Sequence, residues 1–365
     1  MPLMNKLLDP TKTGDEAGAL EIGLKQRIVG QNEAVQNIID LYQIYLTGLS
    51  FPGRPIGNLL FLGPTGSGKT RLVEAAAECL VGTSKAVVKI DCGEFQHSHE
   101  ISKLVGSPPG YLGHRETKAM LSQKTLDEYQ TEKTKLSFVL FDEIEKASDA
   151  LWNLLLGIMN KATLTLGNNE RTDFSRAIIF MTGNLGVREM EAHLLPRMGF
   201  ARNEQLKGTV ITEDIEKKMI SSGKTAAQRR FTPEFINRLD KIVVFKSLGE
   251  PELRRILDIE IHRFQQHILD NSKIPFIFRV TDPAKDQLMK EGSDIRYGAR
   301  HLRRAIQRLV MHPLSCLLAS RQISQGDQVC VDYWIAENRF IFTKEASGIP
   351  EHHMTKPLGG LSAAA

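Results

Sequence analysis

The chain has 365 residues, a net charge of +4 and a pI near 8.7, with 41% hydrophobic and 25% charged residues. That length predicts two or three domains with a substantial core, and the composition is ordinary for a soluble globular protein. The mild positive charge is weak support for a nucleic-acid partner.

The cysteine spacing and the N-terminal sequence exclude several classes of protein. The four cysteines are far apart and lack CxxC spacing, so a disulfide framework or zinc site is not expected. The N-terminus lacks the apolar core of a secretory signal, and no run reaches the eighteen or so apolar residues of a membrane span. We therefore expect a cytoplasmic protein without a membrane partner.

Five short apolar runs predict buried strands, because the strands of a parallel sheet covered on both faces are almost continuously hydrophobic. The runs are 58–63, 86–91, 138–143, 177–184 and 241–245. Helix-like stretches lie between them, and this alternation favours a doubly wound α/β sheet of five parallel strands. Residues 186–229 form a polar connection that is too long for a simple loop.

The character of the chain changes near residue 248. Apolar residues then recur at helical spacing from Leu253 to Ile268, and short strand-like runs follow at "IPFIFRV", "DQVCVDYWI" and "NRFIFTK". We expect a large α/β domain over 1–248, a smaller, mostly helical domain over 249–345 and a disordered tail over 346–365.

The segment "GPTGSGKT" (63–70) follows a predicted strand and opens a predicted helix, and it fits G-x-x-x-x-G-K-[ST]. In such a loop the glycines let backbone N–H groups face phosphate oxygens, the lysine reaches the β- and γ-phosphates, and the hydroxyl binds Mg²⁺. An ordinary glycine-rich turn is the alternative. The predicted ATP-binding residues are Pro64, Thr65, Gly66, Ser67, Gly68, Lys69 and Thr70.

Acidic residues follow the strand at 138–143. Asp142 would hold Mg²⁺ with Thr70, and Glu143 would act as general base for the attacking water. Alone, such a pair would more often cap a helix, but the preceding phosphate loop favours the catalytic interpretation. Asn184 ends the next strand, in "MTGN", where it could orient water or simply form a turn.

Two arginines are candidates for contact with the γ-phosphate. Arg238 lies in "RRFTPEFINRLDKIVVF" and Arg300 in "RYGARHLRRAIQR". A nucleotide hydrolase needs cationic groups there in the transition state, although arginines on their own are usually just solvated.

The order of these motifs, together with "RIVGQNEAV" and "GSPPGYLGH", resembles the AAA+ ATPases of the Clp family. The chain is most similar to the second ATPase module of the ClpA, ClpB and ClpC unfoldases, over about residues 20–343. The resemblance implies a P-loop AAA+ sheet with a C-terminal lid domain. It also implies that Ile28 and Val29 lie by the adenine, that Asn184 is sensor 1, and that Arg300 is sensor 2.

The resemblance further implies an oligomer. Arg238 would be an arginine finger that acts on the nucleotide of a neighbouring subunit, in a homo-oligomeric ring that is usually a hexamer in this family. The glycine-rich loop with Tyr111 and Leu112 would line the central pore and grip unfolded polypeptide, since an aromatic ring can lie against almost any chain. A second pore loop over 164–174 would present Asn168 and Asn169. The alternative for Tyr111 is packing against its own domain.

Three departures from the family pattern bear on substrate handling. The chain shows no recruitment domain, first ATPase module or middle domain, and "HRETKAML" follows the tyrosine loop where the family has acidic and glycine residues. Gly183 replaces the usual serine or threonine before sensor 1.

Met198, Gly199 and Phe200 resemble a loop by which Clp unfoldases dock on the ClpP peptidase. We favour a local hydrophobic anchor for a long loop, so a ClpP-like peptidase partner is not favoured.

The sequence thus predicts an ATPase that uses ATP and Mg²⁺ and drives polypeptide through a single ring, with an adaptor protein as a further partner. A nucleotide-switched assembly or scaffold factor without threading is the alternative. A DNA-acting motor is weaker, because no basic patch with interleaved aromatic residues is present.

Overall fold

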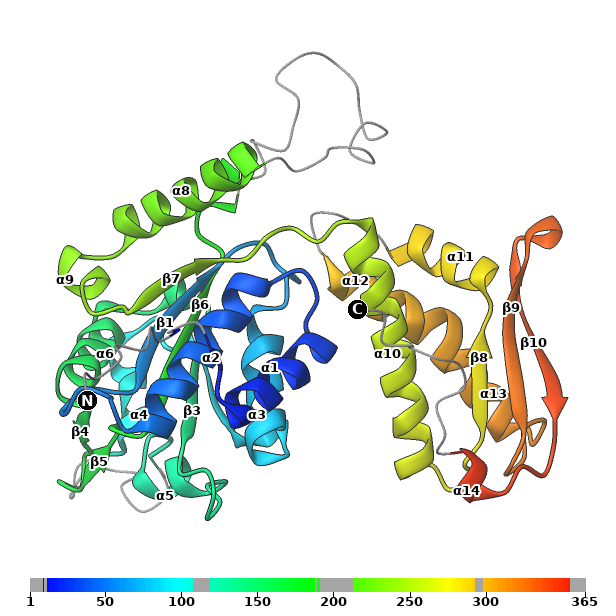
Figure 1. The fold of residues 1–365 in the computed structure, drawn as a ribbon, viewed down its shortest axis with the longest axis horizontal. Coiled ribbons are helices and arrows are strands. Elements are labelled where there is room, and N and C mark those ends of the chain that lie inside the picture. Colours follow the sequence, from blue (N-terminus) through cyan, green and yellow to red (C-terminus); the bar gives the residue numbers. More distant parts are fainter. Residues whose placement is uncertain are drawn as a thin grey trace, which may run out of the picture. The chain divides into compact units, whose positions relative to one another are not determined.

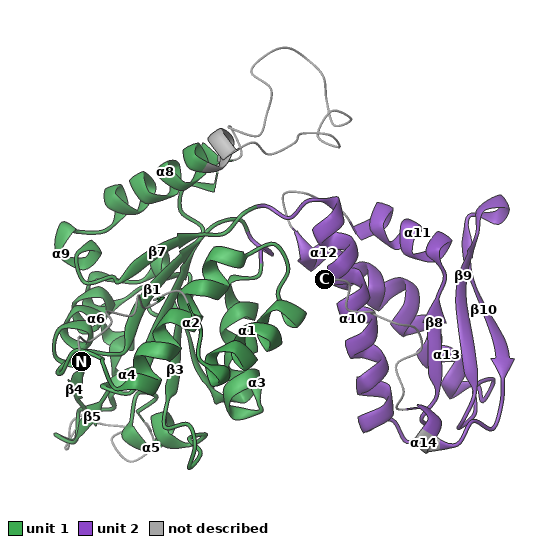
Figure 2. Ribbon diagram, viewed as in Figure 1, with its two compact units in different colours: residues 1–64, 68–246 green, residues 65–67, 247–365 purple. Residues whose placement is uncertain are grey.

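The computed structural model describes residues 9, 12–107, 119–187, 189–190, 213–292 and 298–354. The chain forms two compact units, and each is considered by itself (Figures 1 and 2). Unit 1 comprises residues 1–64 and 68–246, and unit 2 comprises residues 65–67 and 247–365. Within the described ranges, no helix has the length and apolar character needed to cross a membrane.

Unit 1 is built on a five-stranded parallel sheet in the order β2-β3-β6-β1-β7. All five strands predicted from the apolar runs are confirmed. They are β1 (Gly57–Leu62), β2 (Val87–Asp91), β3 (Ser137–Asp142), β6 (Ala177–Gly183) and β7 (Lys241–Val244). The central strands β1, β3 and β6 are buried along almost their whole length, which is why their sequences lack polar alternation.

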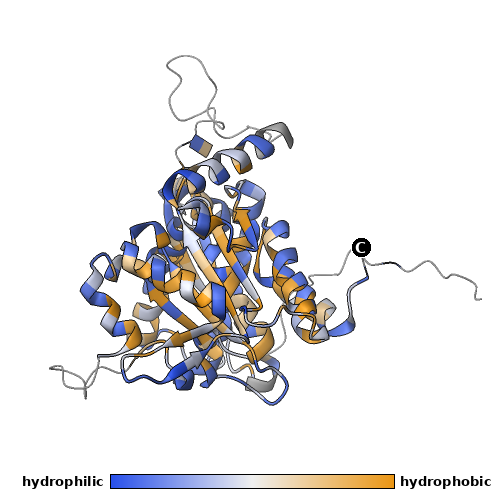
Figure 3. Cartoon of the chain, turned by 90° about the vertical axis from the view of Figure 1, so that its left-hand side faces the viewer, coloured by the Kyte–Doolittle hydropathy of each residue, from blue (hydrophilic) through white to orange (hydrophobic). Residues whose placement is uncertain are grey.

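Helices cover both faces of this sheet, and alternate residues of each strand point to opposite faces. Leu59 and Phe61 face a core shared with α1 (Asp15–Arg27), α2 (Asn32–Thr47) and α3 (Lys69–Val81). Leu60 and Leu62 face the other core, which involves α6 (Asp149–Lys161), α8 (Glu213–Arg230) and α9 (Pro233–Ile236). Hydrophobic residues concentrate on the strands and the inward helix faces (Figure 3).

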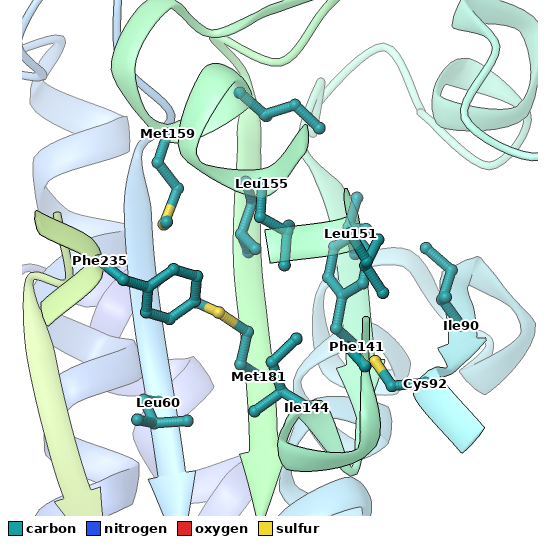
Figure 4. Close-up of a cluster of buried hydrophobic side chains, with 14 of the residues drawn as sticks. Leu60, Ile90, Cys92, Phe141, Ile144, Leu151, Leu155, Met159, Met181 and Phe235 are labelled. Carbon is teal, nitrogen blue, oxygen red and sulfur yellow. The ribbon is translucent and has the colours of Figure 1, made fainter. Parts of the chain in front are cut away.

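The α6 side of the sheet is a continuous hydrophobic cluster. Leu151 and Leu155 of α6 lie over Phe141 and Met181 of the strands, and Phe235 of α9 lies beside Met181 (Figure 4). All five side chains are at most 1% exposed. The strands β3 and β6, which end at Asp142 and beside Asn184, therefore rest on a close-packed hydrophobic layer.

Short elements complete unit 1 between these helices and strands. A two-stranded antiparallel hairpin follows α6, and α8 lies within the long polar connection of 186–229. The elements are η1 (Ser84–Ala86), η2 (Cys92–Glu94), η3 (Ser98–Ile101), α4 (Ser102–Val105), α5 (Gln123–Asp127), η4 (Ile144–Lys146), β4 (Thr163–Thr165) and β5 (Arg171–Asp173).

Unit 2 packs helices against a three-stranded sheet in the order β10-β9-β8. Its strands are β8 (Ile277–Val280), β9 (Gln328–Trp334) and β10 (Arg339–Ala346). Its helical elements are α10 (Glu250–Asn271), α11 (Asp282–Gly292), α12 (Ala299–Ile306), the π-helix η6 (Gln307–Met311), α13 (His312–Ala319), η7 (Ile335–Glu337) and α14 (Glu351–Met354). The three strand-like runs of the sequence are thus confirmed in a mostly helical unit.

The expectation of a disordered tail over 346–365 is wrong for its first part. The Ile349 N–H donates to Gly326 O at 2.8 Å, α14 follows, and Met354 is 4% exposed. One backbone hydrogen bond to the turn before β9 and one buried methionine hold this segment, although its sequence has no periodicity. Residues 355–365 lie outside the described residues.

Candidate nucleotide hydrolysis site

The predicted phosphate loop connects β1 to α3. Gly63, Gly66 and Gly68 have φ angles of 142°, 78° and 102°, a region that favours glycine. A Cβ on Gly63 would also lie 2.6 Å from Phe245 O, so the loop can pass β7 only with glycine there. The helix α3 begins at Lys69, and its N-terminal N–H groups are the kind that bind phosphate.

Lys69 joins two of the predicted motifs. Its Nζ donates to Gly63 O at 2.6 Å, to Pro64 O at 2.9 Å and to Asn184 Oδ1 at 3.0 Å. The lysine is 9% exposed, so these oxygens offset the cost of burying its charge. The structure therefore brings the phosphate-loop lysine and the predicted sensor together at the ends of adjacent strands, β1 and β6.

Asp142 lies beside Thr70 at the end of β3. The Thr70 hydroxyl is 3.5 Å from Asp142 Oδ2, and Thr182 Oγ1 donates to Asp142 Oδ1. A carboxylate and a hydroxyl in this position are the hard oxygen ligands that Mg²⁺ takes in nucleotide sites. The residues present thus fit the predicted Mg²⁺ site.

Glu143 has a left-handed backbone, with φ of 56°. Its N–H donates to Thr182 Oγ1 at 3.1 Å, and its carboxylate forms an ion pair with Lys146. The hydrogen bond between the Glu143 carboxylate and Lys146 raises the pKa of Lys146. The side chain of Glu143 is 34% exposed, so the predicted base can still reach a water outside the sheet.

Asn184 is fixed by a residue that the sequence did not single out. Its backbone N–H donates to Glu145 Oε1 at 2.9 Å. A Cβ on Gly183 would lie 3.0 Å from Glu145 Oε2 and 3.1 Å from Leu62 Cδ2. The departure at Gly183 thus leaves the room that the Glu145 carboxylate occupies.

Cys92 lies near the acidic residues, and its thiol is unreactive at neutral pH. Cys92 is fully buried under the sheet edge (Figure 4). Burial, and then the nearby charge of Asp142, raises the pKa of its thiol, so the group stays protonated at neutral pH.

Ile28 and Val29 follow the end of α1 and are 8% and 7% exposed. Gln31, two residues after Val29, donates through Nε2 to Lys246 O at 3.0 Å and accepts from Lys246 N–H at 3.1 Å. This reciprocal pair holds the 28–31 segment at the end of β7. The contact of Ile28 and Val29 with adenine remains a prediction.

Arg238 lies just after α9, and its role as an arginine finger remains a prediction. Its N–H donates to Phe235 O at 3.1 Å, and its carbonyl accepts from Asn58 Nδ2 at 3.3 Å. Asn58 also donates its N–H to Asp240 Oδ2 at 2.7 Å. These contacts fix the backbone that carries Arg238.

Arg300 lies on α12 in unit 2. Within this unit, the N–H of the preceding Ala299 donates to Gly66 O at 3.3 Å. The sensor 2 role of Arg300 remains a prediction.

The two predicted pore loops share a base. Gly167, in the β4–β5 hairpin, donates its N–H to Val105 O at 2.8 Å, and Leu121 N–H donates to Leu104 O at 3.1 Å. The first bond joins the hairpin to the start of the segment that contains Tyr111 and Leu112, and the second joins the two ends of that segment to each other. Asn169 has a φ of 65°, and Asn168 Oδ1 accepts from Glu170 N–H at 3.1 Å, as expected of a tight hairpin tip.

Several predicted residues fall on parts of the chain that the structure does not cover. Tyr111, Leu112, Met198, Gly199 and Phe200 lie outside the described residues. Their proposed roles in the pore and in peptidase docking are untested.

Sequence reasoning missed three residues of the site, namely Thr182, Glu145 and Lys146. All three stand inside motifs that were recognised, "MTGN" and "FDEIEKA". A polar residue in an otherwise apolar strand and an extra acid after the first two were the available signals.

Comparison with known proteins agrees with this geometry. Residues 54–242 match the model of the AAA domain (Cdc48 subfamily), and residues 248–331 match that of the C-terminal, D2-small domain of ClpB protein. The ATP-binding subunit ClpC of the ATP-dependent Clp protease from Staphylococcus aureus (strain USA300) is 37% identical over 90% of this chain and 38% of its own length. ClpC from Staphylococcus saprophyticus is 37% identical over 89% of this chain and 37% of its own length.

Solved structures show the same arrangement. A closed-state reconstruction of Hsp104 with ATPγS and FITC casein has a TM-score of 0.73 at 27% identity, covering 90% of this chain and 52% of that one. The Saccharomyces cerevisiae Hsp104–ADP complex has a TM-score of 0.71 at 27% identity, covering 89% and 52%. The chain spans about two fifths of the length of the ClpC proteins. With its phosphate loop, the acidic residues at the end of β3 and Asn184 assembled on one parallel sheet, the chain belongs to the AAA ATPase family and matches a Clp-type second ATPase module.

Proposed function

We propose that this chain hydrolyses Mg·ATP and uses the energy to pull unfolded polypeptide through the pore of a ring. The observation that carries the first half is the convergence of Lys69, Asn184, Asp142 and Thr70 through direct contacts. The shared base of the two predicted pore loops supports the second half.

In the proposed reaction, the phosphate loop and Lys69 bind the β- and γ-phosphates, while Thr70 and Asp142 hold the metal. Mg²⁺, when bound, would neutralise charge that develops between the two phosphates. Glu143 takes the proton of the attacking water, for which it must leave its ion pair with Lys146. Asn184 keeps Lys69 aimed at the phosphates.

Arg238 and Arg300 complete the proposed site from elsewhere. Arg238 would reach the γ-phosphate of a neighbouring subunit in a homo-oligomeric, hexameric ring, and Arg300 would report the nucleotide to unit 2. The four cysteines are all free, which supports a reducing compartment such as the cytoplasm.

The test is an unfolding assay on a stable fluorescent protein that carries an unstructured peptide tail. Wild type with Mg·ATP should abolish the fluorescence, and Glu143→Gln should not. If the protein hydrolyses ATP but the fluorescence persists, even after a candidate adaptor protein is added, the result would favour a nucleotide-switched scaffold factor that does not thread polypeptide.

A further inference from the structure

We propose that Glu145, Trp152, Arg230 and Phe231 form a relay that links the sensor Asn184 to the segment carrying Arg238, so that nucleotide in one subunit sets the arginine offered to the next. The idea rests on the proposed function, because it assigns Asn184 and Arg238 the roles given there. It adds Glu145 and Arg230 as positioning residues for the reaction.

In the first step of the relay, Glu145 contacts both Asn184 and Arg230. Its side chain accepts the Asn184 N–H at 2.9 Å, and its backbone carbonyl accepts Arg230 Nη2 at 2.7 Å. Glu145 Oε2 is buried and has no hydrogen-bond partner within the described part of the chain. Because only one of its oxygens is hydrogen-bonded, the carboxylate can follow a movement of Asn184 without breaking a second hydrogen bond.

The second step passes from Arg230 to α6. The Arg230 guanidinium lies 4.5 Å from the centre of the Trp152 ring, in cation–π geometry. Trp152 Nε1 in turn donates to Ile144 O at 3.1 Å, in the turn that carries Glu145. Arg230 and Trp152 therefore hold two consecutive carbonyls of the acidic loop, those of Ile144 and Glu145.

The third step reaches Arg238. The ring of Phe231 packs edge-on against Trp152 at 5.4 Å and stacks on Phe235 at 5.0 Å. The carbonyl of Phe235 accepts the Arg238 N–H at 3.1 Å. Arg230 itself is exposed, but Phe231 and Phe235 are 3% and 1% exposed, so a displacement of the Phe231 ring is passed to α9 through close-packed contacts.

The helix α8 adds a second contact with the sensor loop. Gly186, two residues after Asn184, has a φ of 73°, and a Cβ there would lie 3.2 Å from the Cα of Gly223. The sensor loop thus packs directly on the helix whose last residue is Arg230. The segment that carries Asn184 therefore contacts the relay twice, through Glu145 and through α8.

The chain has only two tryptophans, Trp152 and Trp334, and this allows a direct optical test. In a Trp334→Phe background, Trp152 is the only tryptophan emitter. The nucleotide is the non-hydrolysable analogue AMP-PNP with Mg²⁺, and its affinity is measured separately by calorimetry. We expect a shift in Trp152 emission that saturates with the same Kd as the calorimetric titration.

The relay variant is Arg230→Ala and its matched control is Arg229→Ala, the adjacent exposed arginine on the same helix end. Arg230→Ala should lose the emission shift and lower kcat about three- to tenfold while the affinity for AMP-PNP stays within twofold. Arg229→Ala should change neither. Trp152→Phe, which loses the hydrogen bond to Ile144 O, should show the same split between kcat and affinity if Arg230→Ala does not fold.

The outcomes separate the two proposals. Constant Trp152 emission during nucleotide binding that calorimetry detects would overturn the relay and leave the ATPase intact. A parallel fall in affinity and kcat in Arg230→Ala would make Arg230 merely structural and would also overturn it. If no nucleotide binds to any variant, the proposed function fails and the relay fails with it.

Discussion

Lys69 and Asn184, 115 residues apart, meet in a 3.0 Å hydrogen bond from Nζ to Oδ1. The contact is possible because β1 and β6 are adjacent parallel strands, so both residues lie beyond the same edge of the sheet. It joins the phosphate loop to the predicted sensor.

Replacing Asn184 with alanine should therefore impair the chemical step more than binding. We expect kcat to fall about 100-fold, as when one side chain that supports the transition state is lost, because Lys69 loses the acceptor that aims it at the phosphates. The nucleotide Kd should change only severalfold, because Gly63 and Pro64 still hold Lys69. Steady-state kinetics with a calorimetric Kd would check this, and an equal loss in both quantities would contradict it.

Glu143→Gln should bind ATP with nearly unchanged affinity and lower kcat at least about 100-fold, since an amide cannot accept the proton of the attacking water. Lys146→Gln serves as the control for the loss of the ion pair, because it leaves the base in place. If Glu143→Gln retains hydrolysis close to that of the wild type, the assignment of the base is wrong.

The trans role of Arg238 predicts complementation between two inactive variants. Arg238→Ala keeps its own Glu143, and Glu143→Gln keeps its own Arg238. Mixed rings should therefore hydrolyse ATP faster than either variant alone, because a Glu143→Gln subunit can serve the intact site of its neighbour. ATPase rates over a range of mixing ratios would measure this. A simple linear average of the two rates would place Arg238 outside the neighbour's site.

Gly183→Ser, which restores the residue usual in the family, should be harmful here. The added Cβ would lie 3.0 Å from Glu145 Oε2, so either the carboxylate or the sensor strand must move. We expect a loss of about 1–3 kcal/mol in stability, the range for overpacking a filled site. Thermal unfolding would test it, and shortening Glu145 to aspartate in the same chain should recover part of the loss.

Asp327 should make the stability of unit 2 sensitive to acid. Burial alone would raise the pKa of this carboxyl, but hydrogen bonds from Lys344 and Ser324 outweigh it and hold the pKa below the usual 3.8. A lowered pKa contributes stability above pH 3.8 that is lost as the pH falls toward the folded-state value. Asp327→Ala should cost about 1–3 kcal/mol at neutral pH.

The measurement for Asp327 is denaturant unfolding at a series of pH values. The difference between the wild type and Asp327→Ala should be constant at neutral pH and shrink below pH 3.8. A difference that does not change with pH would show that Asp327 stabilises unit 2 through packing rather than through its charge.

The five-stranded sheet and the polar residues at the carboxyl ends of its strands were predictable from sequence. Continuous apolar runs and the phosphate loop are local patterns that can be read without the structure. The positions of Lys69, Asp142, Glu143 and Asn184 near the strand ends were predicted in this way, and their roles remain predictions. The contacts of Glu145 with Asn184 and Arg230 were not predictable, because they depend on which strands are adjacent and where α8 ends. The packing of residues 347–354 escaped prediction for the same reason: one buried methionine leaves no periodic signal.

The central claim is that ATP turnover is coupled to polypeptide in the pore. The most direct test compares the ATPase rate with and without an unfolded model protein for wild type, Tyr111→Ala and a control, Phe51→Ala, which removes another aromatic residue that is 79% exposed. We predict that unfolded protein stimulates wild type and Phe51→Ala, whereas Tyr111→Ala keeps basal hydrolysis and loses the response. Equal stimulation of all three proteins, or of none, would contradict the proposal that Tyr111 grips polypeptide.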